Sequence, residues 1–531
     1  MPEKFAQLLA QDFTDLDAAT AAWKRLATTL GRTKTGSGGR VTGPLHEAGW
    51  TGVSASYGFD ALRATESKLG TGQVNARLIS TVLDTLHTRM AAAQRTLRNA
   101  VADAEAAGHK VAADGWVEPK TAVDPRHRHD PEYAEIQRRA NSGLGEFRAR
   151  IEQAVTEAET ASYRAGEILH QIDPFDLGKQ YGADNARKDA ALVAEFTGLS
   201  EKDIPDGKSP RRSARWWAAL DEDVRDFYLA AFPERIGALD GLPAGTRDLA
   251  NRAVLDMRLN DYDLRENGLG HHDRSSYRAL LDLKSRMDAT DSGAAHKRMY
   301  LLGFSTESDG RAIVAIGNPD TARHTAVLVP GTNSQLENFG GQIDRVNKLQ
   351  NAAGDRSVGK GRDVSVIAWL GYNAPEYNNS IVTQERALAG APDLRDFTHG
   401  LRAGHEGAPT HLTVLAHSYG STTAGAADAG GRGLDADDMV VVGSPGLTVG
   451  RAEQLHIDPR HLWVGAASND HISNHASGLT LGPDPKDPGF GAQRMYVDTG
   501  GHSGYWDDGS LSLENQGRII AGKDPRDGGL G

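Results

Sequence analysis

The stretch AHSYG, residues 416–420, has the residue types and spacing of a turn that presents a nucleophilic serine. Ser418 follows the aliphatic run HLTVLAH and has Ala416 two positions before it and Gly420 two positions after it. Small residues are needed there because the strand and helix that meet at such a turn bring their backbones close together. The first of the two is usually glycine, so Ala416 departs from the pattern by one methyl group. We predict that Ser418 is a nucleophile.

An aspartate and a histidine follow Ser418 in the chain order that such a site requires. Asp470 lies in ASNDHIS and His502 in TGGHSGYWDDGS, and each of these stretches follows a strand-like run. A serine hydroxyl is a weak nucleophile until a base takes its proton, so we expect His502 to be that base. Asp470 would orient the imidazole and stabilise its cation. Asp498 is the alternative acid for that role.

Backbone N–H groups must receive the negative charge that develops on the substrate oxygen. One donor is expected at Tyr419, directly after the nucleophile. The other is expected in the loop VPGTNSQ (329–335), where Thr332 and Asn333 are the two candidates.

Eight short apolar runs can place these residues on one sheet. The first two are separated by only TESDG, which suits an antiparallel hairpin, and most later gaps are long enough for a crossover helix. Ser418 directly follows the fifth run, as the α/β-hydrolase fold requires. The sequence therefore predicts that fold, with a mostly parallel sheet built from residues 298–305, 311–317, 324–330, 363–372, 411–417, 438–444, 461–467 and 494–500.

The chain before residue 290 has apolar residues at helical spacing, with breaks rich in Gly, Pro and charged residues. We expect an α-helical bundle over residues 1–200 and a helical linker or cap over 201–290. The catalytic α/β-hydrolase domain would then occupy residues 291–531.

Composition excludes several other classes of function. The chain has 531 residues, a net charge of −12 and no cysteine, so we expect no nucleic-acid partner and no thiolate chemistry. The stretches HRHD (127–130) and HHD (271–273) lack a second ligand group at helical or strand spacing, and no nucleotide-binding loop follows a strand, so we expect no metal and no cofactor. We also expect no membrane-spanning segment and no secretory signal, which makes the cytoplasm the default location.

Residues 211–522 resemble an actinobacterial α/β-hydrolase family of unknown function. The resemblance rests on the stretches at 216–255, 316–334, 416–425 and 501–522. It implies a serine hydrolase with esterase-like or lipase-like activity, and it leaves the substrate open.

Trp50-Thr51-Gly52, close to a break between helical segments, resembles the turn of the Trp-x-Gly helical-hairpin proteins exported by type VII secretion. A tryptophan that only packs in a helical core explains the same residues. The resemblance implies a protein partner for the helical region, or export by a type VII-like route.

We predict a hydrolase that cleaves a carboxylic ester or related acyl bond of a small molecule through an acyl-serine intermediate. One alternative is an interaction or export protein whose hydrolase domain is a scaffold or a degenerate enzyme. Another is a peptidase or an acyltransferase on the same fold, because the fold and the nucleophile leave the acceptor unspecified.

Overall fold

The computed structural model describes residues 2–51, 53–119, 126, 128–129, 131–172, 183–265, 268–475 and 480–526. It divides into two compact units, each built from two separate parts of the chain. Unit 1 comprises Met1–Gly31 and Thr71–Glu201, and unit 2 comprises Arg32–Gly70 and Lys202–Gly531. The three-part division expected from the sequence stays a prediction.

Unit 1 is helical, and the long helices predicted for this part of the chain are confirmed. In unit 1, α2 and α4 run antiparallel, because Asp17 pairs with His87 while Gly31, fourteen residues later, faces Gln73. A small apolar core forms where Leu8, Leu97 and Ile151 meet. The elements with residues in this unit are α1 (Pro2–Ala10), α2 (Thr14–Ser37), α4 (Val53–Ala106), β1 (Lys110–Val111), β2 (Val117–Glu118), α5 (Tyr133–Ala140), α6 (Leu144–Gln171) and α7 (Ala183–Thr197).

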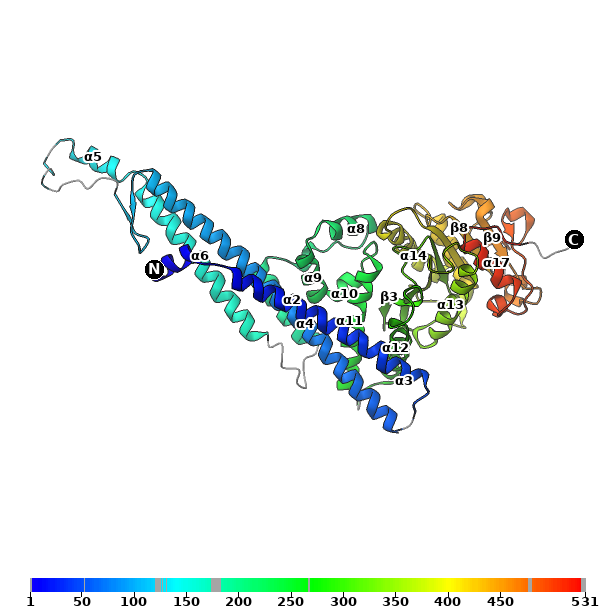
Figure 1. Ribbon diagram of the computed structural model, residues 1–531. Coiled ribbons are helices and arrows are strands. Elements are labelled where there is room, and N and C mark those ends of the chain that lie inside the picture. The colour runs from blue at the N-terminus through cyan, green and yellow to red at the C-terminus, as the bar shows by residue number, and fades with distance from the viewer. Residues whose placement is uncertain are drawn as a thin grey trace. The chain divides into compact units, whose positions relative to one another are not determined.

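Unit 2 contains an eight-stranded sheet that confirms the predicted α/β-hydrolase fold (Figure 1). The strand order is β10-β9-β8-β7-β5-β6-β4-β3, and β4 is antiparallel to both of its neighbours while the other pairs are parallel. The strands are β3 (Met299–Ser305), β4 (Arg311–Ile316), β5 (His324–Val329), β6 (Val364–Leu370), β7 (His411–His417), β8 (Asp438–Val442), β9 (Leu462–Gly465) and β10 (Gln493–Arg494).

Helices cover the sheet, which explains why its central strands are aliphatic throughout. Every residue of β6 and β8 is buried, as expected for parallel strands covered on both faces. Helices α13 (Gly340–Gly354) and α17 (Leu511–Ile520) pack on one another, and so do α14 (Glu385–Gly404) and α15 (Tyr419–Ala429). The eighth strand is shorter than predicted: only Gln493 and Arg494 pair with β9, and the residues that follow form the loop that carries His502.

Helix α11 (Ala244–Leu264) begins near the amino ends of the parallel strands, whereas Ser418 lies at their carboxyl ends. The Ala244 N–H donates to Asp320, at 2.7 Å, and Asp320 lies just before β5. Ser418 follows the opposite, carboxyl end of β7, which is parallel to β5. The start of α11 therefore lies away from Ser418, and the possible cap over residues 201–290 stays a prediction. The other α-helices between residue 202 and the sheet are α8 (Pro210–Ala219), α9 (Glu222–Ala231), α10 (Pro233–Gly237) and α12 (His271–Asp291).

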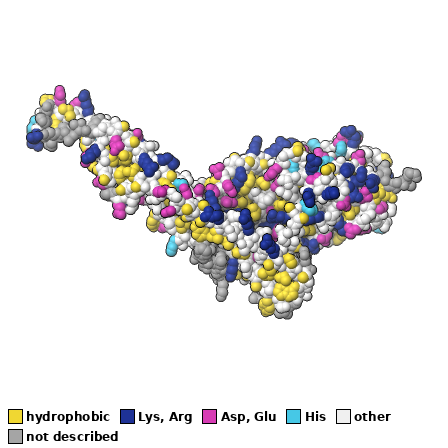
Figure 2. Space-filling model, viewed as in Figure 1, with side chains coloured by type: hydrophobic (Ala, Val, Ile, Leu, Met, Phe, Trp, Pro, Cys, Tyr) yellow, Lys and Arg dark blue, Asp and Glu magenta, His cyan; other side chains and the backbone are white. Residues whose placement is uncertain are grey.

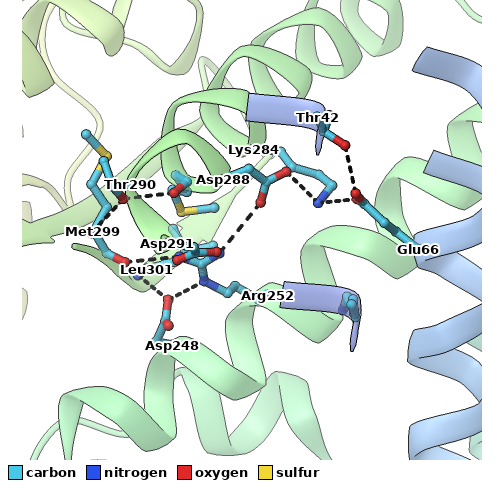
Figure 3. Close-up of polar contacts among 12 residues, drawn as sticks. Thr42, Glu66, Asp248, Arg252, Lys284, Asp288, Thr290, Asp291, Met299 and Leu301 are labelled. Atoms are coloured by element: carbon cyan, nitrogen blue, oxygen red, sulfur yellow. Dashed lines mark hydrogen bonds and ion pairs between the residues drawn. The ribbon is translucent and has the colours of Figure 1, made fainter. Parts of the chain in front are cut away.

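Residues 32–70 join unit 2 through buried charges, which we call the Lys284 cluster: Lys34, Thr42, Glu66, Asp248, Arg252, Asp256, Lys284, Asp288 and Asp291 (Figure 3). The Lys284 ammonium lies 2.9 Å from both Glu66 of α4 and Asp288 of α12. Thr42, in the π-helical turn Gly38–Thr42 before α3 (Gly43–Glu47), donates to Glu66 at 2.9 Å. These contacts explain why this segment of the N-terminal helices belongs with the sheet.

Arg252 of α11 extends the Lys284 cluster to the first strand. Its guanidinium lies 2.8 Å from Asp248 and 2.9 Å from Asp291 and also donates to the Met299 carbonyl (Figure 3). Asp248 in turn accepts the Leu301 N–H at 2.8 Å. A buried charge is tolerated when it is paired, and the charged residues of the cluster pair with one another across α2, α4, α11 and α12 and contact the backbone of β3.

Charged side chains of both signs and hydrophobic side chains are mixed on the visible face of the protein (Figure 2). On the face shown in Figure 2, Lys and Arg side chains lie among Asp and Glu side chains. Of the helices in the described part of the chain, none is long and apolar enough to cross a membrane.

Candidate active site

Ser418 occupies a strained turn between β7 and α15. Its backbone has φ +56° and ψ −132°, a conformation that residues with a side chain adopt rarely. Gly420 is required beside it, because a Cβ there would lie 2.3 Å from the Val329 carbonyl oxygen. Ala416 is buried and paired with Val329 in the ladder between β5 and β7, so its extra methyl group fits. The turn holds the serine at the carboxyl end of the sheet.

Ser418, His502 and Asp470 form one hydrogen-bonded chain. The Ser418 Oγ lies 2.8 Å from His502 Nε2. On the other side of the ring, His502 Nδ1 lies 2.9 and 3.0 Å from the two carboxylate oxygens of Asp470. The structure therefore brings together the three residues singled out from the sequence. With Nδ1 protonated toward the carboxylate, Nε2 is free to accept the serine proton.

The Asp470 carboxylate is fully buried and receives several donors besides His502. The Tyr505 hydroxyl donates to it at 2.5 Å, and the N–H groups of Ile472 and Ser473 donate at 2.9 and 3.3 Å. Burial raises the pKa of Asp470, but the hydrogen bonds from His502 and Tyr505 outweigh burial and hold that pKa below its ordinary value. The Asp470 carboxyl is therefore charged at neutral pH.

Asp498, the alternative acid, has a different position. Its carboxylate accepts the N–H groups of Leu511 and Ser512 at 3.0 and 3.1 Å. These are the first residues of α17, so Asp498 satisfies the free N–H groups at the start of that helix.

The two expected sources of backbone N–H donors lie side by side. A Cβ on Gly331 would be 2.7 Å from the Ser418 Cβ and 2.9 Å from the Tyr419 nitrogen. The loop after β5 thus approaches the start of α15, where the first N–H groups have no partner within the helix. The Asn333 N–H donates to the Pro375 carbonyl at 2.8 Å, which engages one of the two loop candidates. Thr332 stays the other candidate for the second donor.

Four residues of the site gave no recognised signal in the sequence. Gly331 and Gly443 permit close contacts, and a Cβ on Gly443 would lie 3.0 Å from Asp470 and 3.1 Å from the His502 ring. Tyr505 donates to Asp470, and His417 contacts His502. Position along the chain could have identified them, because each lies in a loop that follows a strand or directly beside Ser418.

No residue set in the described ranges suits a metal ion. Among residues 2–475 and 480–526, leaving aside the gaps within them, no three His, Cys, Asp or Glu side chains are arranged to hold one. The chemistry available at this site is that of Ser418, His502, Asp470 and backbone N–H groups.

Comparisons with known proteins agree with the fold. Residues 306–480 match the model of the Abhydrolase_8 family, described as alpha/beta hydrolase. The uncharacterized protein Rv2079 of Mycobacterium tuberculosis (strain ATCC 25618 / H37Rv) is 29% identical over 90% of this chain and 81% of its own length. The uncharacterized protein Mb0988c of Mycobacterium bovis is 31% identical over 46% of this chain and 91% of its own length. These names give no substrate.

Proposed function

We propose, from the premise that this chain belongs to the alpha/beta-hydrolase family, that it is a serine hydrolase that cleaves a carboxylic ester. The observation that carries the proposal is the hydrogen-bonded chain from Ser418 through His502 to Asp470, at 2.8 and 2.9 Å. Distances in this range allow proton transfer between nucleophile and base.

The reaction follows from this geometry. Ser418 Oγ attacks the ester carbonyl carbon while His502 Nε2 takes the serine proton. The N–H groups of Tyr419 and Thr332 would then stabilise the oxyanion. When the bond to the alcohol breaks, His502 gives its proton to the departing oxygen and an acyl-serine remains. Water then attacks the acyl carbon while His502 Nε2 takes its proton, and as the bond from the acyl carbon to Ser418 Oγ breaks, His502 gives that proton to Oγ and the carboxylic acid is released.

Exposed apolar side chains near the site support an apolar acyl group. Tyr377 and Val382 lie in the segment after β6, and Ile472 lies in the short helix after β9, so they are at the same end of the sheet as Ser418. The Thr480 hydroxyl donates to the Val382 carbonyl, and the Gln384 side-chain amide donates to the Thr480 carbonyl. These two hydrogen bonds link the segment after β6 to the segment after β9. Exposed apolar surface beside a nucleophile provides area that an aliphatic or aromatic substrate can cover.

Labelling with a fluorophosphonate probe tests this function on the full-length protein. We expect the wild type to be labelled and Ser418→Ala and His502→Ala to lose labelling. Ser365→Ala is the matched control, because Ser365 is buried and its Oγ hydrogen-bonds to the Gly317 carbonyl at the other end of the sheet. Hydrolysis of p-nitrophenyl esters of increasing acyl length would then define the acyl group. A folded wild type that is not labelled, or labelling that persists in Ser418→Ala, would contradict the proposal.

A further inference from the structure

His417 is the buried residue directly before the nucleophile, and it contacts the loop that carries the base. Its side chain is 6% exposed, and its Nε2 lies 2.7 Å from the His502 carbonyl oxygen. A carbonyl oxygen only accepts, so Nε2 must carry the hydrogen. The residue thus donates one short hydrogen bond to the backbone of His502.

Aromatic rings enclose the His417 ring. Its centroid lies 4.7 Å from that of His502, 5.9 Å from that of Tyr505 and 5.0 Å from that of Trp506. Arg345 of α13 lies over the outer side of Trp506, with its guanidinium carbon 4.4 Å from the ring centroid. Contacts of this kind fix a ring in one orientation.

His417 stays uncharged while His502 gains and loses a proton. Burial, followed by the positive charges of His502 and Arg345, lowers the pKa of His417 to about 3. A second imidazolium at 4.7 Å would oppose protonation of His502, whereas a neutral ring does not. The N–H donor on Nε2 is fixed by the carbonyl oxygen that accepts it, and the lowered pKa keeps the His417 ring uncharged beside His502.

We propose that His417 is a positioning residue that holds the loop of His502 in register with Ser418, through its Nε2–H bond to the His502 carbonyl oxygen. The inference rests on the proposed hydrolase function. His417 and Ser418 are consecutive, so this bond ties the base to the same strand end that carries the nucleophile. The loop of His502 otherwise follows the two-residue strand β10, which gives it little support from the sheet.

Two replacements separate the hydrogen bond from the packing. His417→Phe keeps a ring but removes the donor, whereas His417→Gln places an amide N–H near the position of Nε2. We expect His417→Phe to lower the second-order rate of fluorophosphonate labelling at least about tenfold, the effect of losing one hydrogen bond in the reactive geometry. We expect His417→Gln to recover most of the rate.

Thr325→Val is the matched control for the general cost of a buried hydrogen bond. Thr325 Oγ1 pairs with Thr410 Oγ1 at 3.0 Å, at the opposite end of the sheet. This variant should lose stability in a denaturant titration without losing labelling rate. Equal rates for His417→Phe and wild type would overturn the inference, and so would equally slow His417→Phe and His417→Gln proteins.

A measurement without turnover keeps this inference separate from the proposed function. With ¹³Cε1-labelled histidine, the His502 resonance can be assigned by its loss in His502→Gln. If His417 positions His502, that resonance should shift and broaden in His417→Phe and return toward its wild-type position in His417→Gln. An unlabelled wild type would contradict the hydrolase proposal, but only an unchanged His502 resonance in His417→Phe would then overturn the positioning role.

Discussion

Asp470 and Asp288 are both buried carboxylates that lie beside a basic side chain, yet their pKa values move in opposite directions. The pKa of Asp470 lies below its ordinary value, because hydrogen bonds outweigh the effect of burial. Burial instead raises the pKa of Asp288 to about 6, and the negative charge of Glu66 adds to that rise against the opposing effect of Lys284. Burial alone therefore does not decide whether a carboxylate is charged.

The number of donors accounts for the difference. Asp470 accepts hydrogen bonds from two side chains and two backbone N–H groups, with no carboxylate beside it in its set of partners. Asp288 has one close donor, Lys284, and shares it with Glu66, while Arg252 is 3.8 Å away. Several hydrogen-bond donors around Asp470 stabilise its charged form. In the Lys284 cluster, several carboxylates share each cation, so Asp288 is stabilised less.

The largest effect is expected for Asp470→Asn. The amide would present its N–H₂ group or its oxygen to His502 without the charge that stabilises the imidazolium, so labelling and ester hydrolysis should fall about 10³–10⁴-fold. Asp498→Asn is the control, because an asparagine can still accept the N–H groups at the start of α17. If Asp498→Asn lost labelling and Asp470→Asn kept it, Asp470 would not be the acid that orients His502.

Removing the central cation of the Lys284 cluster should cost about 3–5 kcal/mol of unfolding free energy. Lys284→Met leaves Glu66 and Asp288 buried without their shared partner. Arg286→Met, on the same helix, removes a half-exposed cation from Asp282 and Asp344 and should cost less than about 1 kcal/mol. Denaturant titration of both variants measures the difference. Similar losses would show that the cluster is not held together by Lys284.

Tyr505→Phe should remove one hydrogen bond to the Asp470 carboxylate and leave the carboxylate itself in place. Loss of the hydroxyl donor to a charged acceptor costs about 2 kcal/mol and raises the pKa of Asp470 toward its ordinary value. A depressed carboxyl pKa contributes stability that is present above its unfolded value and lost as the pH falls. The variant should therefore lose stability at pH 7 and show a shallower further loss toward acid.

Tyr372→Phe serves as the control for Tyr505→Phe. The Tyr372 hydroxyl donates to the neutral Pro330 carbonyl at 2.7 Å, and its loss should cost about 1 kcal/mol. Urea titrations from pH 7 down to about pH 3, across the range in which an unfolded aspartate with a pKa of about 3.9 gains its proton, compare the two. If the stability difference between each variant and the wild type had the same pH dependence, Tyr505 would not act through the charge of Asp470.

The smallest expected effect is the contribution of Asp288 to the pH dependence of stability. A carboxyl pKa raised to about 6 gives stability that is present below the unfolded pKa and lost as the pH rises through 6. Because of Asp288, the free energy of unfolding of the wild type should fall by about 1 kcal/mol as the pH rises from 5 to 7. Asp288→Asn, which still faces Lys284, Glu66 and Arg252, should lack that loss. An unchanged slope in paired denaturant titrations would show that Asp288 does not titrate in this range.

The sheet could be predicted from the sequence because buried parallel strands leave long aliphatic runs. Seven of the eight runs contain a strand, the eighth overlaps β10 only at Arg494, and the hairpin of β3 and β4 forms as expected. The grouping of residues 32–70 with the sheet could not be predicted. Glu66 and Lys284 lie on helices where charged residues usually face solvent, and only their three-dimensional pairing shows that these two are buried.

The candidate site was partly predictable for a related reason. Ser418 and His502 lie in stretches whose spacing follows from the fold. His417 and Tyr505 act on the site through single hydrogen bonds to His502 and Asp470, and no spacing rule identifies such contacts. The engagement of the Asn333 N–H by Pro375 likewise depends on a loop from another strand.

The two-part composition of unit 2 has a consequence for the order in which the chain folds during synthesis. Residues 32–70 leave the ribosome before Asp256, Lys284 and Asp288 have been made, so Lys34 and Glu66 must wait for these partners. Unit 1 ends at residue 201 and can complete its own core in that interval. The sheet of unit 2, whose first strand begins at Met299, is therefore completed after unit 1, and only then do Lys34 and Glu66 have all their partners in the Lys284 cluster.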